Sequence, residues 1–169
     1  MKIWIFLLIV FPFASFAQDT CGLKKTKDPF TNVTKLSTGF KKFDGNKLMV
    51  SISADATPTE IDFFIWVKNE GKCFDAESEA EMIWEGEKRK TKLKNSGSMN
   101  CEGAFHFIFK NSTTTPSWLN RMANQRIASI KLTGSNNTLS EIILTEEQKA
   151  LFQRMAVCIT AEAKALRAQ

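Results

Sequence analysis

Few residues of this chain have the type and spacing that catalysis needs. His106 is the only histidine. A serine or cysteine nucleophile usually needs a histidine base that is itself oriented by a partner, and the sequence around His106 indicates no such group. No Gly-x-Ser-x-Gly segment is present either. We therefore expect His106 to be a half-buried strand residue, and we predict no catalytic, cofactor-binding or metal-binding residue.

An acidic stripe and a basic stripe follow each other along the chain. Glu77, Glu79 and Glu81 alternate with other residues, and four lysines alternate after a Glu-Gly pair: Lys88, Lys90, Lys92 and Lys94. A lysine stripe can follow a phosphate backbone, but a hairpin would place glutamates opposite the lysines. We therefore predict a solvated, charge-paired sheet face. The glutamates also leave open the hypothesis of a hydrolase that acts through carboxylates.

Four cysteines follow the first twenty residues: Cys21, Cys73, Cys101 and Cys158. Their wide spacing, without a C-x-x-C pair, excludes the common zinc and thioredoxin motifs. An even number of cysteines in an exported chain indicates two disulfides, for which three pairings exist. Extending a hairpin over 78–94 backwards brings the segments on either side of it together, which predicts the pair Cys73–Cys101. The second disulfide is then Cys21–Cys158, between the N-terminal segment and the last helix.

The first seventeen residues have the features of an export signal. Lys2 precedes an apolar run over 3–11, and Ser15 and Ala17 place small residues at the −3 and −1 positions of a cleavage site. We expect cleavage between Ala17 and Gln18. The apolar run is about half of the roughly 20 residues that a membrane-spanning helix needs. The sequence therefore predicts an exported protein, periplasmic or extracellular, without a membrane span after cleavage.

Length and charge limit the number of domains and the class of partner that the rest of the chain can have. Removing 17 of the 169 residues leaves 152, which suits one exported domain over 18–169. The net charge of +5 becomes +4 when Lys2 is removed with the signal. A charge of this size does not indicate a nucleic-acid partner. We therefore expect the partner to be a protein or another component of the cell envelope.

Alternation of apolar and polar residues predicts eight strands, with Asp44-Gly45 and Glu85-Gly86 as hairpin turns. The predicted ranges are 36–40, 47–54, 61–68, 78–85, 87–94, 102–110, 127–133 and 138–144. The strand over 61–68 is apolar on both faces, so we expect it to be central and covered on both sides. A two-residue turn at 85–86 places three pairs opposite each other: Ile83 with Lys88, Glu81 with Lys90, and Glu79 with Lys92.

Two helices complete the expected fold. A short helix near 116–124 has Thr115 as its N-cap, with three apolar residues on its buried side: Trp118, Leu119 and Met122. A C-terminal helix over 145–167 begins with a capping box of Thr145 and Gln148 and carries an apolar stripe: Leu151, Met155, Cys158, Ile159 and Leu166. The fold class is mainly β (α+β), an antiparallel β-sandwich or partly open barrel of about seven or eight strands. The C-terminal helix packs on the sheet.

Aromatic residues leave two interpretations open. The predicted export signal contains Phe6, Phe11, Phe13, Phe16 and Trp4. The rest of the chain therefore has ten of the 14 phenylalanines and three of the four tryptophans. Rings on sheet faces ordinarily form the core, but in small barrels they can also line a cavity for an apolar ligand. The leading hypothesis is an exported, non-catalytic binding or interaction module of the cell envelope. The alternative is a carrier of an apolar ligand in a Phe-lined barrel.

Three short segments carry a resemblance to known proteins: Asp28-Pro29-Phe30-Thr31, Ile83-Trp84-Glu85-Gly86-Glu87 and Ile127-Ala128-Ser129-Ile130-Lys131-Leu132. Together with the helix that follows, they resemble small exported Gram-negative bacterial β-rich proteins of unknown function. The resemblance covers most of the chain after residue 17. It implies an exported β-domain and supplies no catalytic residue.

Overall fold

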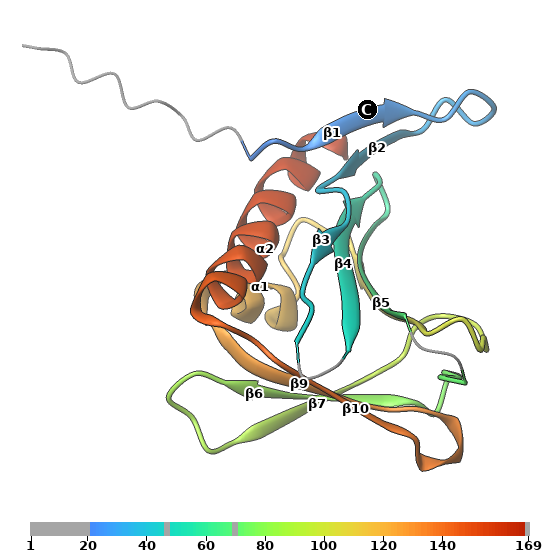
Figure 1. Ribbon diagram of the computed structural model, residues 1–169. Helices are drawn as coiled ribbons and strands as arrows, with labels where there is room; N and C mark the ends of the chain where they lie inside the picture. Colours follow the sequence, from blue (N-terminus) through green and yellow to red (C-terminus); the bar gives the residue numbers. More distant parts are fainter. Residues whose placement is uncertain (1–20, 46–47, 69–70, 168–169) are drawn as a thin grey trace, which may run out of the picture.

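The computed structural model describes residues 21–45, 48–68 and 71–167. These residues form ten β-strands in two antiparallel sheets, together with two α-helices (Figure 1). The predicted fold class, mainly β with a C-terminal helix on the sheet, is confirmed. The two sheets do not close into a barrel. The predicted signal segment and its cleavage site lie outside the described residues.

The larger sheet has the strand order β1-β2-β4-β5-β8, with β3 paired to β4 beside β2. Its strands are β1 (Lys24–Lys27), β2 (Thr34–Ser37), β3 (Lys41–Lys42), β4 (Met49–Ala56), β5 (Glu60–Lys68) and β8 (Ala104–Lys110). The smaller sheet has the order β10-β9-β6-β7. Its strands are β6 (Glu79–Trp84), β7 (Lys90–Lys94), β9 (Ile127–Thr133) and β10 (Leu139–Ile143), and a single 3-10 turn, η1 (Ser135–Asn137), joins the last two.

The two strands beyond the predicted eight are β1 and β3. Every residue of both strands is exposed, and five of the six are lysines. Neither strand therefore shows the apolar alternation from which strands are predicted. Both are held by backbone pairing, β1 to β2 and β3 to β4.

Strand β5 lies between β4 and β8, as an interior strand should. Its inward residues Ile61, Phe63 and Ile65 are buried. The expectation that both faces are covered is wrong, because Trp66 on the opposite face is 39% exposed. Helix α2 (Glu146–Leu166) contacts the larger sheet through β2, β4 and β5. On the outer face, the ring of Phe40 lies beside those of Phe64 and Trp66 and leaves Trp66 partly exposed.

Helix α2 contacts β2, β4, β5 and β9, so it joins the two sheets (Figure 1). The predicted capping box is confirmed, since Thr145 and Gln148 satisfy each other's backbone N–H groups. The short helix is α1 (Ser117–Asn124), and it buries Leu119 and Met122 as predicted. Its predicted N-cap is wrong. Pro116 occupies that position, and no side chain caps the helix.

The phenylalanine rings of the inner face pack on one another and on α2. The ring centroids of Phe63 and Phe152 are 5.6 Å apart, and those of Phe43 and Phe152 are 6.2 Å apart. All three side chains are at most 1% exposed. These rings fill the layer between sheet and helix, as core residues do. The alternative hypothesis of a carrier in a Phe-lined barrel therefore lacks its barrel.

Both predicted disulfides are confirmed. Cys73 pairs with Cys101, next to a β-bridge between Phe74 and Asn100. Cys21 pairs with Cys158 and so connects the start of β1 to the middle of α2. The first disulfide joins the chain before β6 to the chain before β8, at the junction between the two sheets.

The predicted register of the β6–β7 hairpin is wrong by two residues. Glu79 lies opposite Lys94, and Glu81 lies opposite Lys92. The cause is the loop, because the chain does not re-enter the sheet until Lys90 and the turn is therefore longer than two residues. Long lysine side chains nevertheless lean along the strand and form diagonal ion pairs of 2.7 to 2.8 Å: Lys90 with Glu81, Lys92 with Glu79, and Lys94 with Glu77. The predicted charge-paired face is confirmed.

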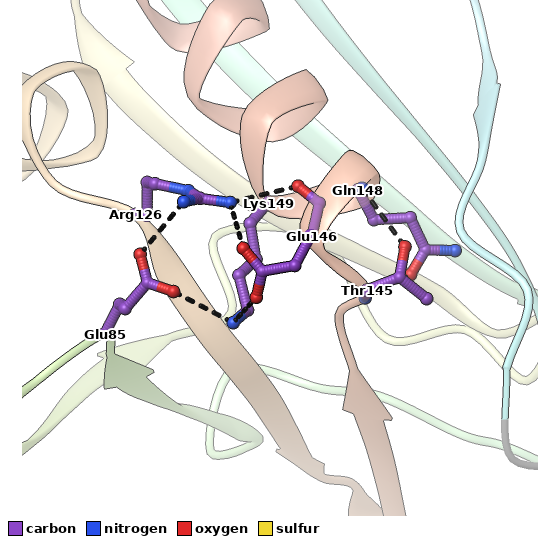
Figure 2. A network of polar contacts seen from close by, with 6 residues as sticks. All are labelled: Glu85, Arg126, Thr145, Glu146, Gln148 and Lys149. Atoms are coloured by element: carbon purple, nitrogen blue, oxygen red, sulfur yellow. Dashed lines mark hydrogen bonds and ion pairs between the residues drawn. The ribbon is translucent and has the colours of Figure 1, made fainter.

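Four charged side chains fix the smaller sheet to the first turn of α2 (Figure 2). Arg126 lies 3.3 Å from Glu85 and 2.7 Å from Glu146, and Lys149 lies 3.0 Å from Glu85 and 2.6 Å from Glu146. Hydrogen bonds from Lys149 and Arg126 lower the pKa of Glu146, and the same glutamate raises the pKa of Lys149. Two acids and two bases thus neutralise each other, which indicates a structural clamp.

Candidate binding face on the larger sheet

The outer face of the larger sheet carries a group of aromatic side chains at its surface. We call it the aromatic face and define it by the rings of Phe40, Phe64, Trp66 and His106. Phe64 and Trp66 occupy alternate positions of β5, so the pleat that buries their neighbours points both of them outward. His106 lies directly opposite Phe64 on β8. Phe40 comes from the segment between β2 and β3.

Small residues on β4 make room for Phe40. Ser53 and Ser51 lie opposite Phe64 and Trp66 in the sheet. The ring of Phe40 reaches across them, with its centroid 5.5 Å from that of Phe64 and 6.4 Å from that of Trp66. Phe40 remains 55% exposed and Trp66 39% exposed. These edge-on and tilted contacts are favourable ring geometries that leave aromatic surface open to solvent.

The imidazole of His106 is held on three sides. Its ring stacks on Phe64 at 4.6 Å with an interplanar angle of 13°, and its Nδ1 lies 2.8 Å from Oδ2 of Asp62. A Cβ atom at Gly97 would lie 2.7 Å from His106 Cδ2, so only glycine fits beside the ring. Among the described residues, Nε2 has no hydrogen-bond partner. In a neutral imidazole whose Nδ1 donates to a carboxylate, Nε2 is left as an acceptor.

The prediction for His106 is thus confirmed in one respect and wrong in another. Its side chain is 27% exposed, so it is a half-buried strand residue. The expectation that it lacks an orienting partner is wrong, because Asp62 is that partner. The two residues are 44 positions apart in the sequence, and antiparallel pairing of β5 with β8 brings them together.

A short segment after β7 covers the free edge of β8. The Ser96 N–H donates to the carbonyl of His106 at 2.9 Å, and the His106 N–H donates to Oδ1 of Asn95 at 2.9 Å. The Ile108 N–H donates to the hydroxyl of Ser96. An open strand edge is a site for unwanted pairing, and here these bonds occupy it. They also fix the backbone that carries the imidazole.

Three oxygen atoms beside the rings lack partners. Asp55 and Asp62 lie directly opposite each other on β4 and β5. One oxygen of each is engaged, Asp55 Oδ2 with Lys35 at 3.1 Å and Asp62 Oδ2 with His106. Within residues 21–45, 48–68 and 71–167, the remaining Oδ1 atoms and the hydroxyl of Ser53 are buried without a hydrogen bond. Opposed like charges and unsatisfied buried groups both destabilise a sheet. Asp55, Asp62 and Ser53 therefore do not contribute to stability in the way core residues do, which indicates a functional role for this face.

The described residues around His106 do not include a nucleophile hydrogen-bonded to its imidazole. All four cysteines are in disulfides, and no hydroxyl in the described part of the chain is hydrogen-bonded to Nε2 of His106. A nucleophile and its base should lie within hydrogen-bonding reach. The Oδ1 atoms of Asp55 and Asp62 are shielded from solvent, so a substrate cannot reach them. The glutamates considered for a hydrolase, Glu77, Glu79 and Glu81, are in the ion pairs of the smaller sheet.

The sequence contained a signal for the aromatic face. Asp62, Phe64 and Trp66 occupy one set of alternate positions in β5, with the core residues on the other set. Because we expected both faces of β5 to be buried, the sequence did not predict a surface site on its outer face. Phe40 and His106 could not be assigned to it, because only the pairing of β4 and β5 with their neighbours brings them there.

Among the described residues, no group of three or more histidine, cysteine or acidic residues is arranged to hold a metal ion. No helix in residues 21–45, 48–68 and 71–167 is long and apolar enough to cross a membrane. Comparison with protein-family models, with curated proteins and with solved structures finds no match for this chain.

Proposed function

We propose that this protein is an exported, non-catalytic binding module that holds a glycan of the cell envelope on its aromatic face. The observation that carries the proposal is the exposure of Phe40 and Trp66 beside a fixed imidazole on the outer face of the larger sheet. A tryptophan that is only partly covered in the middle of a sheet presents apolar surface to a ligand. The two disulfides support an oxidising, extracytoplasmic location.

The rings suit a ligand with an apolar C–H surface. The π-face of an aromatic ring is negative, and the C–H groups on one side of a pyranose carry partial positive charge. The indole N–H of Trp66 donates to the carbonyl of Glu102 at 2.8 Å, which fixes the orientation of the ring. A ring that is already fixed loses little entropy when a ligand stacks on it.

Polar groups around the rings suit hydroxyls. The Nε2 atom of His106 is an acceptor in the tautomer that Asp62 favours, and Ser51 lies beside Trp66 on β4. A hydroxyl both donates and accepts, so it can bond either group. A neutral glycan combines these hydroxyls with the C–H surface that the rings require. The resemblance to small exported Gram-negative proteins agrees with an envelope ligand and is part of this proposal.

Titration with soluble cell-wall glycan fragments tests the function, with chemical-shift changes and calorimetry as readouts. We expect shifts centred on Trp66 and His106, and we expect Trp66→Ala to weaken binding by about tenfold or more, as loss of a central aromatic anchor does. Phe30→Ala removes an equally aromatic but remote side chain that is 92% exposed, and it should leave binding unchanged.

Two outcomes would overturn the proposal. Equal glycan affinity of the Trp66→Ala and wild-type proteins would remove the aromatic face as the site. A protein partner that protects Trp66 from solvent, with no glycan bound, would retain the site but replace the ligand.

A further inference from the structure

The hairpin of β1 and β2 projects from the body of the molecule as an arm (Figure 1). We call residues 24–35 the basic arm, because it contains Lys24, Lys25, Lys27 and Lys35. Residues 24–33 are all exposed. Phe30 stands at the tip and is 92% exposed, more than any other exposed large hydrophobic residue of the described chain. The arm therefore combines lysines along its strands with a phenylalanine ring at its end, beside the carboxylate of Asp28.

The tip is preorganised by a carboxylate. Oδ1 of Asp28 accepts hydrogen bonds from the backbone N–H groups of Phe30 at 2.9 Å and Thr31 at 2.7 Å. The backbone closes the same loop, since the Asp28 N–H donates to the carbonyl of Val33. The bonds from Thr31 are the largest cause of the lowered pKa of Asp28. A loop held in this way presents the Phe30 ring without first having to order itself.

The lysines of β1 differ from the other lysine row of the protein. Within the described residues, Lys24, Lys25 and Lys27 form no ion pair, and of the arm's lysines Lys35 alone is bound, to Asp55. The three lysines of β7, in contrast, are each bound to a glutamate. The positive charges of β1 are thus available to an outside partner. Lysines can also protect a sheet edge from aggregation, but that role does not explain a bare phenylalanine at the tip.

We propose that the basic arm docks on anionic lipid headgroups, with Phe30 entering the interface between headgroups and acyl chains. Aromatic rings favour this interfacial region, and lysines near it are attracted by the negative surface potential. A single ring with three lysines gives reversible surface contact, because a stable anchor needs a larger apolar insertion. The Cys21–Cys158 disulfide joins the base of the arm to α2, so docking of the arm fixes the whole domain at the surface. The proposal is independent of the glycan site.

Vesicle binding tests the proposal directly. Full-length protein is mixed at low salt with phosphatidylcholine vesicles that contain or lack phosphatidylglycerol, and bound protein is measured by co-sedimentation. We expect binding only with phosphatidylglycerol, and its loss at high salt. Each lysine should contribute about fivefold, so replacing Lys24, Lys25 and Lys27 with Gln should weaken binding by about a hundredfold. Phe30→Ser should weaken it by about tenfold or more.

A matched control separates a local site from net charge. Replacing Lys90, Lys92 and Lys94 with Gln changes the net charge by the same amount but removes lysines that are already ion-paired. We expect this variant to bind vesicles far better than the arm variant. Phe30→Trp adds an optical probe, and its fluorescence should shift to the blue and be quenched by brominated lipids. Unfolding midpoints check that each variant folds.

Three outcomes would overturn the proposal. Equal losses in the two lysine variants would show attraction by net charge alone. An unquenched Phe30→Trp in vesicle-bound protein would show that the tip does not enter the bilayer. Binding to polyglutamate without binding to phosphatidylglycerol vesicles would identify an acidic protein as the partner instead.

Discussion

The imidazole of His106 occupies the space that a side chain at position 97 would need, so Gly97 and His106 lie directly against each other. A Cβ atom at Gly97 would lie 2.7 Å from Cδ2 and 3.3 Å from Cγ of the imidazole. The backbone of Gly97 does not need positive φ, so the glycine is explained by the ring alone. The imidazole cannot retreat, because its other side stacks on Phe64.

Replacement of Gly97 by alanine should therefore displace His106 or strain the sheet. We expect a loss of about 1–3 kcal/mol in the free energy of unfolding, the range for overpacking, measured by urea denaturation. The His106 ring resonances should shift as well. Gly45→Ala is the control, because its Cβ would make an ordinary contact of 3.7 Å. Equal stability of the two variants would contradict the packing described here.

Ser53 offers the opposite test, a substitution that should stabilise. Its hydroxyl is buried without a partner, and removing an unsatisfied buried hydroxyl is nearly neutral or favourable. We expect Ser53→Ala to raise the free energy of unfolding by up to about 1 kcal/mol. Ser78→Ala should lower it by about 1–2 kcal/mol, because the equally buried hydroxyl of Ser78 bonds to Asp75. Destabilisation by Ser53→Ala would indicate a partner that the protein alone does not provide.

The guanidinium group of Arg121 contacts an aromatic ring and two polar side chains at once. Its guanidinium carbon lies 4.3 Å from the centre of the Trp84 ring, and its nitrogens donate to Glu87 and Gln125 at 2.6 and 2.8 Å. Lysine carries the charge but not this fork. We expect Arg121→Lys to cost about 1–2 kcal/mol and to change the tryptophan fluorescence. Arg154→Lys, at an exposed position without an ion pair in the described chain, should leave both unchanged.

Asp75 should make stability depend on pH in the acid range. Hydrogen bonds from the hydroxyls of Ser78 and Ser135 lower its pKa in the folded protein. A lowered folded pKa gives stability that is complete above the unfolded value, near 3.9, and is lost as pH falls through the folded value. The loss of unfolding free energy between pH 7 and pH 3 should therefore be smaller in Asp75→Asn, with Ser135→Ala intermediate. Identical pH dependence in all three proteins would refute this contribution.

The two disulfides should differ in their effect on stability. They close loops with sequence separations of 28 and 137 residues, and the entropy removed from the unfolded chain grows with loop length. We expect serine replacement of Cys73 and Cys101 to cost about 3.5 kcal/mol, and of Cys21 and Cys158 about 5 kcal/mol. Urea denaturation of the two double variants measures both values. A smaller effect of the longer loop would mean that structure in the unfolded chain already closes it.

Much of the fold follows from local patterns. The capping box of Thr145 and Gln148 defines the start of α2, and alternation in β5 defines its inner face. Strands β1 and β3 could not be predicted, because their exposed residues, mostly lysines, show no alternation of apolar and polar side chains. The β6–β7 register escapes it because turn length, not charge pairing, sets which residues lie opposite each other. The pair of Asp62 and His106 escapes it because contacts between distant segments depend on strand order, which local patterns do not contain.

The connectivity of the cysteines has a consequence for how the molecule matures. In chain order the first cysteine pairs with the fourth and the second with the third, so one loop is nested inside the other. A chain made from its N-terminus presents Cys21 and Cys73 long before Cys158. Oxidation in order of appearance would therefore join the wrong pair, and exchange of disulfides must then correct it.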